Sequence, residues 1–280
     1  MNNSKIIVFG AGEITNLLIK DLTFSGNKVI CVTENSFGQV DDLLHINLET
    51  ATYKEVTNKK IKVDAAIFSW KNLNRLIQDN QAVLRWLESE MFQASKSIHL
   101  SSASVYKLSD EPQSEDCDVL ESNAKVELEK SLKNLSIRKK TMHTDLRISN
   151  VYGIDISYGF IGSLFDSIKS GSEIQILQNL NITRDYIHVE DVIYAIKMLL
   201  EIDDYPDFIN ISTGIGTTLS ELLDAFSAKG FNFENRMDLS TEVKVREFSV
   251  LDCKRLAELI EWQPKSLNQV LNKLFPNNLT

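Results

Sequence analysis

The chain has 280 residues, 43% of them apolar and 25% charged, which is ordinary for a globular protein that buries a core. Thirty Lys and Arg against 39 Asp and Glu give a formal net charge of −9, which disfavours general binding to nucleic acid or to an anionic membrane. The three cysteines are widely spaced and no apolar run approaches the length of a membrane span. We therefore expect a protein of the reducing cytoplasm with no membrane segment and no zinc site.

A strand, a glycine turn and a helix open the chain. Lys5–Phe9 is an apolar, β-branched run, Gly10-Ala11-Gly12 follows it directly, and residues 14–24 carry Ile and Leu on a helical period. Lys28–Thr33 reads as a second buried strand. These elements predict one βαβ unit with parallel strands.

Strands and helices continue to alternate along the next hundred residues. The expected strands are Asp64–Phe68, Ser97–Leu100 and Met142–Ile148, and helical patterns lie around residues 72–92 and 119–135. This alternation predicts an α/β fold with a Rossmann-type, doubly wound parallel sheet and helices on both faces.

The rhythm changes after about residue 152. Helices near 160–170, 190–201, 218–228 and 252–261 are joined by short strands such as Arg184–His188 and Phe208–Ile211. We expect residues 1–152 to form the dinucleotide-binding Rossmann domain, with returns from the later part, and residues 153–280 to form a smaller α/β cap that binds substrate.

The glycine turn is the candidate cofactor site. A dinucleotide site needs glycines where the chain turns tightly and where backbone approaches a pyrophosphate at a helix N-terminus, although two glycines in a turn are also common without a ligand. Thr15 replaces the third glycine of the fingerprint and is expected to hold helix and strand apart or to demand a local shift. Glu34 either receives the adenosine ribose, favouring NAD over NADP, or is a solvated loop residue. The expected contacts in the turn are Gly10, Ala11, Gly12, Glu13 and Ile14.

Four later segments carry further motifs. They are Ser101-Ser102-Ala103-Ser104-Val105-Tyr106, Leu146-Arg147-Ile148-Ser149-Asn150-Val151-Tyr152-Gly153, Arg184-Asp185-Tyr186-Ile187-His188-Val189-Glu190-Asp191-Val192 and Trp262-Gln263-Pro264. In this order they resemble S-S-x-x-V-Y, L-R-x-x-N-V-Y-G, R-D-Y-I-H-V-x-D-V and W-x-P of the extended short-chain dehydrogenase/reductase family. That group of NAD-dependent epimerases and dehydratases acts on nucleotide sugars, and the resemblance spans nearly the whole chain.

The resemblance implies that a Ser or Thr, a Tyr and a Lys do the chemistry. Ser102 matches the hydroxyl that orients the sugar oxygen, and its alternative role is to cap the loop after a strand. Lys125, followed by Glu129, matches the lysine that binds the nicotinamide ribose and lowers the pKa of the Tyr. In the family, hydride then passes to or from the nicotinamide. The position of the Tyr, four residues before the lysine, holds Glu121.

Two residues are candidates to replace the missing tyrosine. Glu121 is either a substitute general base, ionised at neutral pH, or half of a surface ion pair with Lys125 one helical turn away. Tyr106, at the end of the serine loop, is a second candidate proton donor. Two alternatives to this enzyme are a catalytically degenerate relative with a binding or regulatory role and an enzyme of different chemistry on the same fold.

Substrate contacts also follow from the resemblance. Asn150 and Arg184 match positions that contact the nucleotide diphosphate, and Arg246 lies in a similar late segment. A guanidinium suits a diphosphate because it donates two parallel, charge-assisted hydrogen bonds. The alternative is that Arg184 and Arg246 form surface ion pairs with the acidic residue that follows each of them, Asp185 and Glu247.

The amino-terminal part departs from the family pattern at two further positions. Asn47 falls roughly where the family has an aspartate that contacts adenine, and Phe9 stands where many members have the first glycine. The expected cofactor is still NAD, or NADP. Because family members often dimerise through a four-helix bundle, we expect a homodimer through the helices near 72–92 and 119–135.

The type of reaction is narrowed by Ala103 and Ser104. Sugar-nucleotide 4,6-dehydratases carry an Asp-Glu pair at these places, so dehydration is disfavoured. A 4-epimerase or a keto-sugar reductase that acts on a nucleotide-diphosphate sugar remains. The four histidines do not cluster in the sequence, His143 and His188 are expected to be structural, and we predict no metal.

Overall fold

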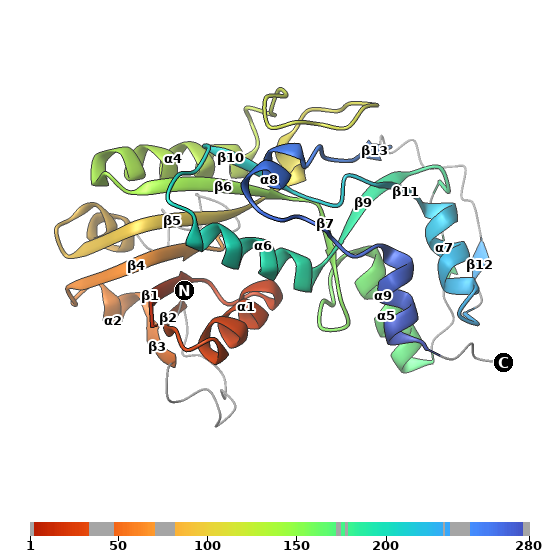
Figure 1. Cartoon of the computed structure of the whole chain (residues 1–280), viewed down its shortest axis with the longest axis horizontal. Coiled ribbons are helices and arrows are strands. Elements are labelled where there is room, and N and C mark those ends of the chain that lie inside the picture. The colour runs from red at the N-terminus through yellow and green to blue at the C-terminus, as the bar shows by residue number, and fades with distance from the viewer. Residues whose placement is uncertain are drawn as a thin grey trace. The chain divides into compact units, whose positions relative to one another are not determined.

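The chain divides into two compact units (Figure 1). Unit 1 comprises Met1–Val105, Val119–Arg147 and Ile193–Ile209, and unit 2 comprises Tyr106–Asp118, Ile148–Val192 and Asn210–Thr280. The structure, a computed structural model, describes residues 3–33, 48–70, 82–171, 175–176, 179–231, 233–235 and 247–276.

A seven-stranded sheet runs through unit 1. In sheet order its strands are β10 (Phe208–Ile211), β6 (Met142–Ile148), β5 (Phe92–Ser102), β4 (Ile61–Phe68), β1 (Lys5–Phe9), β2 (Lys28–Thr33) and β3 (Leu48–Thr52). The pairs from β5 through β4, β1 and β2 to β3 are parallel. The strand order reverses between β1 and β4, which is where open α/β sheets bind ligands at the carboxyl ends of their strands. The predicted Rossmann-type doubly wound sheet is confirmed.

Helices lie on both faces of this sheet. They are α1 (Glu13–Phe24), α2 (Tyr53–Val56), α4 (Ala124–Lys139) and most of α6 (Val189–Glu201), and residues 82–88 are also helical. An ion pair joins Lys197 of α6 to Asp21 of α1, so these two helices share a face. Figure 1 shows α4 along β5 and β6, and α4 packs against β5. Covered on both faces, β1 is fully buried from Ile6 to Phe9.

An aromatic cluster occupies the space around the end of β1. The ring of Phe9 is fully buried and stacks on Phe68 with ring centroids 5.0 Å apart. Trp70, Trp86 and Phe92 surround it at centroid distances between 5.4 and 6.4 Å. A large side chain is accommodated at the position of a family glycine because neighbouring strands supply matching rings.

Unit 2 is smaller and built from short elements. Its strands are β7 (Asn150–Tyr152), β9 (Thr183–His188), β11 (Gly216–Thr218) and β13 (Phe248–Ser249), with β8 (Gln175–Ile176) pairing β12 (Glu234–Asn235). Its helices are α5 (Gly159–Ser170), α7 (Leu219–Ser227), α8 (Lys254–Leu259) and α9 (Leu267–Leu274). The core formed by α5, α7 and α9 is aliphatic and aromatic, with Phe165 and Phe226 among its buried rings.

Three expected elements differ in the structure. The helix expected over 119–135 begins only at Ala124, because Asn123 caps it, and it continues to Lys139. In the pattern at 72–92, residues 71–81 lie outside the described residues, residues 82–88 are helical, and β5 already begins at Phe92. Phe208–Ile211, expected to link the later helices, is the edge strand β10 of the main sheet. Among the described helices, none is both long and apolar enough to cross a membrane.

Candidate active site

The glycine turn between β1 and α1 has the geometry that a tight turn needs. Gly10 has a φ of +98°, and a Cβ there would lie 3.1 Å from the carbonyl oxygen of Ser69. Its N–H donates to the carbonyl of Val32 at 2.9 Å, which holds the turn over the end of β2. Both the backbone conformation and the space require glycine at this position.

The backbone after Gly10 is open to solvent. Ala11 and Gly12 are exposed, and a Cβ placed on Gly12 would meet only the Thr15 hydroxyl, at 3.8 Å. Gly12 is the N-cap of α1, so the first amides of the helix point toward this open backbone. An uncovered glycine turn at a helix N-terminus fits the pyrophosphate of a dinucleotide.

Thr15, in place of the third glycine, closes the first turn of α1. Its hydroxyl accepts a hydrogen bond from the N–H of Gly12 at 2.7 Å and donates one to the carbonyl of Gly12 at 3.0 Å. The side chain is fully buried, so the strand and helix accommodate it. Sequence reasoning expected a local shift here but missed this capping role, because the usual capping box has a Glu or Gln at the third helical position.

Ser102 lies at the carboxyl end of β5, as a catalytic hydroxyl on a parallel sheet should. Its Oγ accepts a hydrogen bond from the N–H of Ser104 at 3.2 Å, in the short 3-10 helix Ala103–Val105 that follows. The capping role is therefore present in the structure. The side chain is half-buried and the capping hydroxyl keeps its own proton to donate.

Asn123 joins the serine loop to the start of α4. Its side-chain amide donates to the carbonyl of Ser104 at 2.8 Å, and its Oδ1 accepts from the N–H of Lys125 at 2.9 Å. One residue thereby fixes the Ser102 loop against the first turn that carries Lys125. The sequence contains a signal for this helix start, because Asn is a preferred N-cap residue. The helix expected over 119–135 nevertheless includes Asn123 in its interior.

Glu121 lies in the turn before α4 and not on the helix. Its exposed carboxylate forms an ion pair with Lys130, so the expected helical pairing with Lys125 is wrong. The four-residue spacing puts two side chains on one face only when both belong to the same helix, and the cap at Asn123 intervenes.

Tyr106, the other candidate proton donor, is fully buried in unit 2. Its hydroxyl donates to Oδ1 of Asn210 at 2.7 Å. The amide of Asn210 in turn donates to the carbonyls of Gln113 at 2.9 Å and Asp252 at 3.0 Å. These contacts make Tyr106 an anchor of the segment that follows the serine loop.

The candidate substrate residues Asn150 and Arg184 both lie in unit 2. The amide of Asn150 donates to the carbonyl of Asp185 at 3.0 Å, and the Arg184 guanidinium donates to the carbonyls of Thr183 at 2.8 Å and Glu247 at 3.2 Å. Burial lowers the pKa of Arg184 from its usual value. Glu34, Asn47 and Arg246 lie outside the described residues.

The alternative pairing of Arg184 with Asp185 is wrong. The carboxylate of Asp185 is fully buried and accepts hydrogen bonds from the N–H and hydroxyl of Thr213, at 3.0 and 2.7 Å, and from the N–H of Gly214 at 2.9 Å. Neighbours in a strand point to opposite faces, so adjacent residues such as these do not pair easily.

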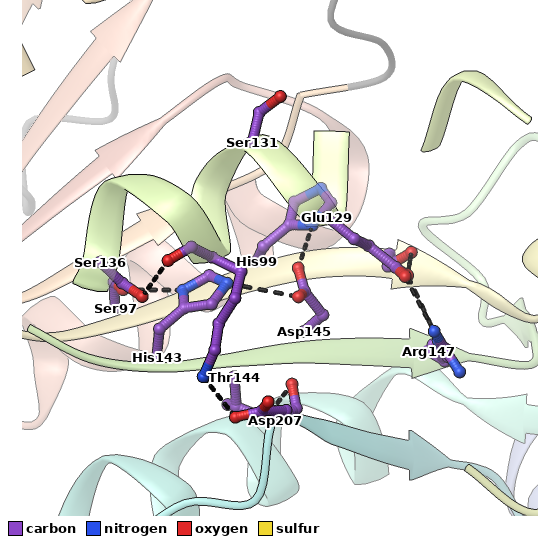
Figure 2. A network of polar contacts seen from close by, with 12 residues as sticks. Ser97, His99, Glu129, Ser131, Ser136, His143, Thr144, Asp145, Arg147 and Asp207 are labelled. Atoms are coloured by element: carbon purple, nitrogen blue, oxygen red, sulfur yellow. Dashed lines mark hydrogen bonds and ion pairs between the residues drawn. The ribbon is translucent and has the colours of Figure 1, made fainter. Parts of the chain in front are cut away.

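Two histidines that lie far apart in the sequence come together in the structure (Figure 2). His99 Nδ1 lies 2.7 Å from Oδ1 of Asp145, and His143 Nε2 lies 3.3 Å from Oδ2 of the same carboxylate. Ser97 Oγ lies 2.8 Å from Nδ1 of His143. All four side chains are buried between β5 and β6. In the described segments no group of three His, Cys, Asp or Glu could hold a metal.

A buried ion pair adjoins this network. Glu129 of α4 accepts a hydrogen bond from Arg147 of β6 (Figure 2). It also accepts one from the hydroxyl of Ser101, the neighbour of Ser102 on β5. Glu129 lies one helical turn after Lys125. Unit 1 therefore brings together Ser102, Asn123 and Lys125 on a helix and strand that are joined through buried charge.

Comparison with known proteins agrees with this geometry. Residues 6–212 match the NAD dependent epimerase/dehydratase family. A dTDP-4-dehydro-6-deoxyglucose reductase of Escherichia coli is 30% identical over 173 residues, which are 59% of this chain and 54% of that protein. A dTDP-4-dehydro-6-deoxy-D-allose reductase of a Streptomyces species is 31% identical over 134 residues, which are 46% of this chain and 40% of that protein. The matches thus span about half the length of these relatives or less.

Solved structures share the whole fold. A UDP-glucose 4-epimerase of Thermotoga maritima with UDP-glucose superposes with a TM-score of 0.77 at 23% identity, covering 97% of both chains. A UDP-glucuronic acid 4-epimerase of Bacillus cereus with UDP-glucuronic acid and NAD gives 0.75 at 16% identity, covering 97% of this chain and 100% of that one. These likenesses establish the fold, and the match over residues 6–212 establishes more: the chain belongs to the NAD dependent epimerase/dehydratase family.

Proposed function

We propose that this protein is an NAD(P)-dependent enzyme that acts on a nucleotide-diphosphate sugar, as a 4-epimerase or a keto-sugar reductase. The observation that carries the proposal is the hydrogen-bonded path from Ser102 through Ser104 and Asn123 to Lys125. It joins a hydroxyl at the end of a parallel strand to a lysine in the first turn of a helix, on a chain whose family is NAD dependent.

Each residue has a distinct role in this proposal. The Ser102 hydroxyl donates a hydrogen bond to the reacting sugar oxygen, and the Lys125 ammonium binds the nicotinamide ribose and favours negative charge nearby. The backbone of Gly10, the exposed backbone of Ala11 and Gly12, and the first amides of α1, at Glu13 and Ile14, hold the pyrophosphate. Bound NAD(P) supplies hydride chemistry, which no protein side chain can supply.

The acid or base that replaces the family tyrosine is Glu121 in this proposal. Its carboxylate is exposed in the turn directly before α4, so it can exchange protons with solvent and with a bound sugar. Tyr106 is less suited, because its hydroxyl is buried and already donates to Asn210. Glu121→Gln should abolish turnover and leave cofactor affinity intact, and unchanged turnover would remove Glu121 from the mechanism.

Asn150, Arg184 and Arg246 are proposed to bind the nucleotide diphosphate, and Glu34 and Asn47 the adenosine part of the cofactor. The guanidinium of Arg184 already donates to two backbone carbonyls, which fix its position in unit 2. We also propose a homodimer in the cytoplasm that uses α4, whose Ile137 side chain is 63% exposed. Sedimentation of Ile137→Glu beside the wild type tests this, because a charge in an apolar interface should yield monomers.

The test of the proposal begins with the cofactor. Any nucleotide that co-purifies is released and identified, and NAD(H) and NADP(H) are then titrated by fluorescence. No binding of any of them at millimolar concentration would overturn the proposal.

If binding is found, dTDP- and UDP-linked 4-keto sugars and 4-hydroxy sugars are offered with the preferred cofactor. Ser102→Ala and Lys125→Met should lose turnover, while Ser131→Ala and Lys133→Met on α4 serve as matched controls that keep it. Cofactor binding without turnover of any sugar would point to a regulatory relative.

A further inference from the structure

We infer that Thr15 and Glu13 make the cofactor an exchangeable co-substrate and that the reaction is therefore reduction of a keto sugar, not epimerisation. The inference rests on the proposed function and concerns the same site. It starts from two side chains in the first turn of α1, the capping hydroxyl of Thr15 and the carboxylate of Glu13.

The first is the Thr15 hydroxyl. It lies 2.7 Å from the amide nitrogen of Gly12 and accepts that N–H, which is the backbone donor at the exposed glycine where a pyrophosphate approaches. A diphosphate oxygen can take this donor only by displacing the hydroxyl. The hydroxyl also donates to the Gly12 carbonyl at 3.0 Å, so displacement breaks two hydrogen bonds. A glycine at position 15 would leave the donor unoccupied.

The second is the Glu13 carboxylate, the acidic group in the first turn of α1. An acid at this position interacts favourably with the positive end of the helix dipole, which is the same attraction that draws a diphosphate. When a diphosphate binds beside it, the two negative charges repel. Both side chains therefore stabilise the site without ligand and weaken diphosphate binding, by separate mechanisms.

Weak cofactor binding distinguishes the two reactions because their hydride balance differs. Epimerisation removes a hydride from a sugar carbon and returns it to the same carbon, so the cofactor ends each cycle as it began and can remain bound. Reduction breaks the C=O π bond of the keto sugar: the carbon takes a hydride from the nicotinamide C–H bond of NAD(P)H, the oxygen takes a proton from the general acid, and NAD(P)+ is left. That product must dissociate before the next NAD(P)H can bind, so a reductase requires release at every turnover.

The experiment measures dissociation constants and dissociation rates of NADH and NADPH on the full chain, by fluorescence titration and stopped-flow displacement, without any sugar. The wild type should lose bound nucleotide on gel filtration. Thr15→Val keeps the shape of the side chain but frees the Gly12 amide, so the cofactor should bind about tenfold more tightly, the value expected for one hydrogen bond to a charged group. Because Gly12 is exposed, water can satisfy its amide in the free variant.

Three variants provide controls. Thr15→Ser keeps the hydroxyl and should bind like the wild type. Thr23→Val removes a buried hydroxyl from the far end of α1, where it donates to the carbonyl of Ile19, and should leave affinity unchanged.

The second side chain is tested by Glu13→Gln, which should tighten cofactor binding about threefold at low salt. The third control is Glu127→Gln in the first turn of α4, which should leave cofactor affinity unchanged.

The outcomes separate this inference from the proposed function. Tighter binding and slower release in Thr15→Val, despite a lower melting temperature from the lost cap, would support it. Unchanged or weaker binding in a folded Thr15→Val would overturn it while leaving the proposed function intact, as would a wild type that retains one nucleotide per chain through dialysis. No binding in the wild type or any variant would overturn both.

Discussion

Glu129 of α4 and Arg147 of β6 form an ion pair with an O–N distance of 2.9 Å while both side chains are at most 3% exposed. The Ser101 hydroxyl donates to the same carboxylate at 2.5 Å, and the guanidinium lies 4.1 Å above the ring centre of Phe208. Three strands and a helix thus meet at one buried charge. Such a pair adds little net stability while both partners are present, because desolvation offsets much of its attraction.

The first prediction concerns this pair. Glu129→Gln should lower the free energy of unfolding by about 3 kcal/mol, because it leaves the guanidinium of Arg147 buried without a counter-charge. The double variant Glu129→Met/Arg147→Met should recover much of that loss. Urea unfolding measures both, with the exposed Glu127→Gln as control. A double variant as unstable as the single one would show that packing, not the unpaired charge, sets the cost.

The second prediction is a dependence of stability on pH that arises from Asp145. Burial raises the pKa of this carboxyl, but hydrogen bonds from His143 and His99 outweigh burial and hold the pKa below its usual value. A folded pKa below the unfolded one contributes stability that is present above the unfolded pKa of about 4 and is lost as the pH falls through the folded pKa.

Asp145→Asn should remove that contribution. Its unfolding free energy should be lower than that of the wild type at pH 6, and the difference should shrink below about pH 4, where the wild type loses the benefit of the carboxylate. Unfolding curves between pH 3 and 7 test this, with the exposed Asp166→Asn as control. A difference that stays constant across the acidic range would contradict the assignment.

The third prediction separates anchoring from catalysis at Tyr106. Tyr106→Phe leaves Oδ1 of Asn210 without its buried donor and should cost about 1–3 kcal/mol of stability. Turnover should survive, because the hydroxyl is not the proton donor. The matched control is Tyr205→Phe, which removes a buried hydroxyl that has no hydrogen-bond partner among the described residues and should cost almost nothing. Loss of turnover in a stable Tyr106→Phe variant would show that the Tyr106 hydroxyl takes part in catalysis.

The parts of the fold that the sequence predicts well are those governed by local periodicity. Lys5–Phe9, Lys28–Thr33 and Met142–Ile148 are strands with the expected bounds, because each is a short apolar run between turn residues. The parts it misses depend on partners distant in sequence. His99 and His143 meet at Asp145 only because β5 and β6 are neighbours in the sheet.

The candidate site shows the same division. The positions of Ser102 and Lys125 follow from motifs, since strand and helix are local. The prediction that Glu121 lies on the same helix as Lys125 is wrong, because the N-cap residue Asn123 decides where that helix begins. The neighbouring sequence could not predict how the fold accommodates the large side chain of Phe9 either. The rings that pack on it come from β4, β5 and the segments beside them.

The last prediction tests whether Asn123 joins the serine loop to Lys125 for catalysis. Its side chain has two separable halves, since Oδ1 caps α4 and Nδ2 holds the carbonyl of Ser104. Asn123→Ala should lose both, with a stability cost of about 1 kcal/mol from the cap and a lower kcat. Asn123→Asp keeps the cap acceptor but cannot donate to Ser104, so stability should return while kcat stays low. Ser266→Ala, which removes the cap of α9, should cost similar stability without changing kcat. Wild-type kcat in Asn123→Asp would mean that the serine loop holds its place without this bond, because the only function then left to Asn123 is to begin the helix.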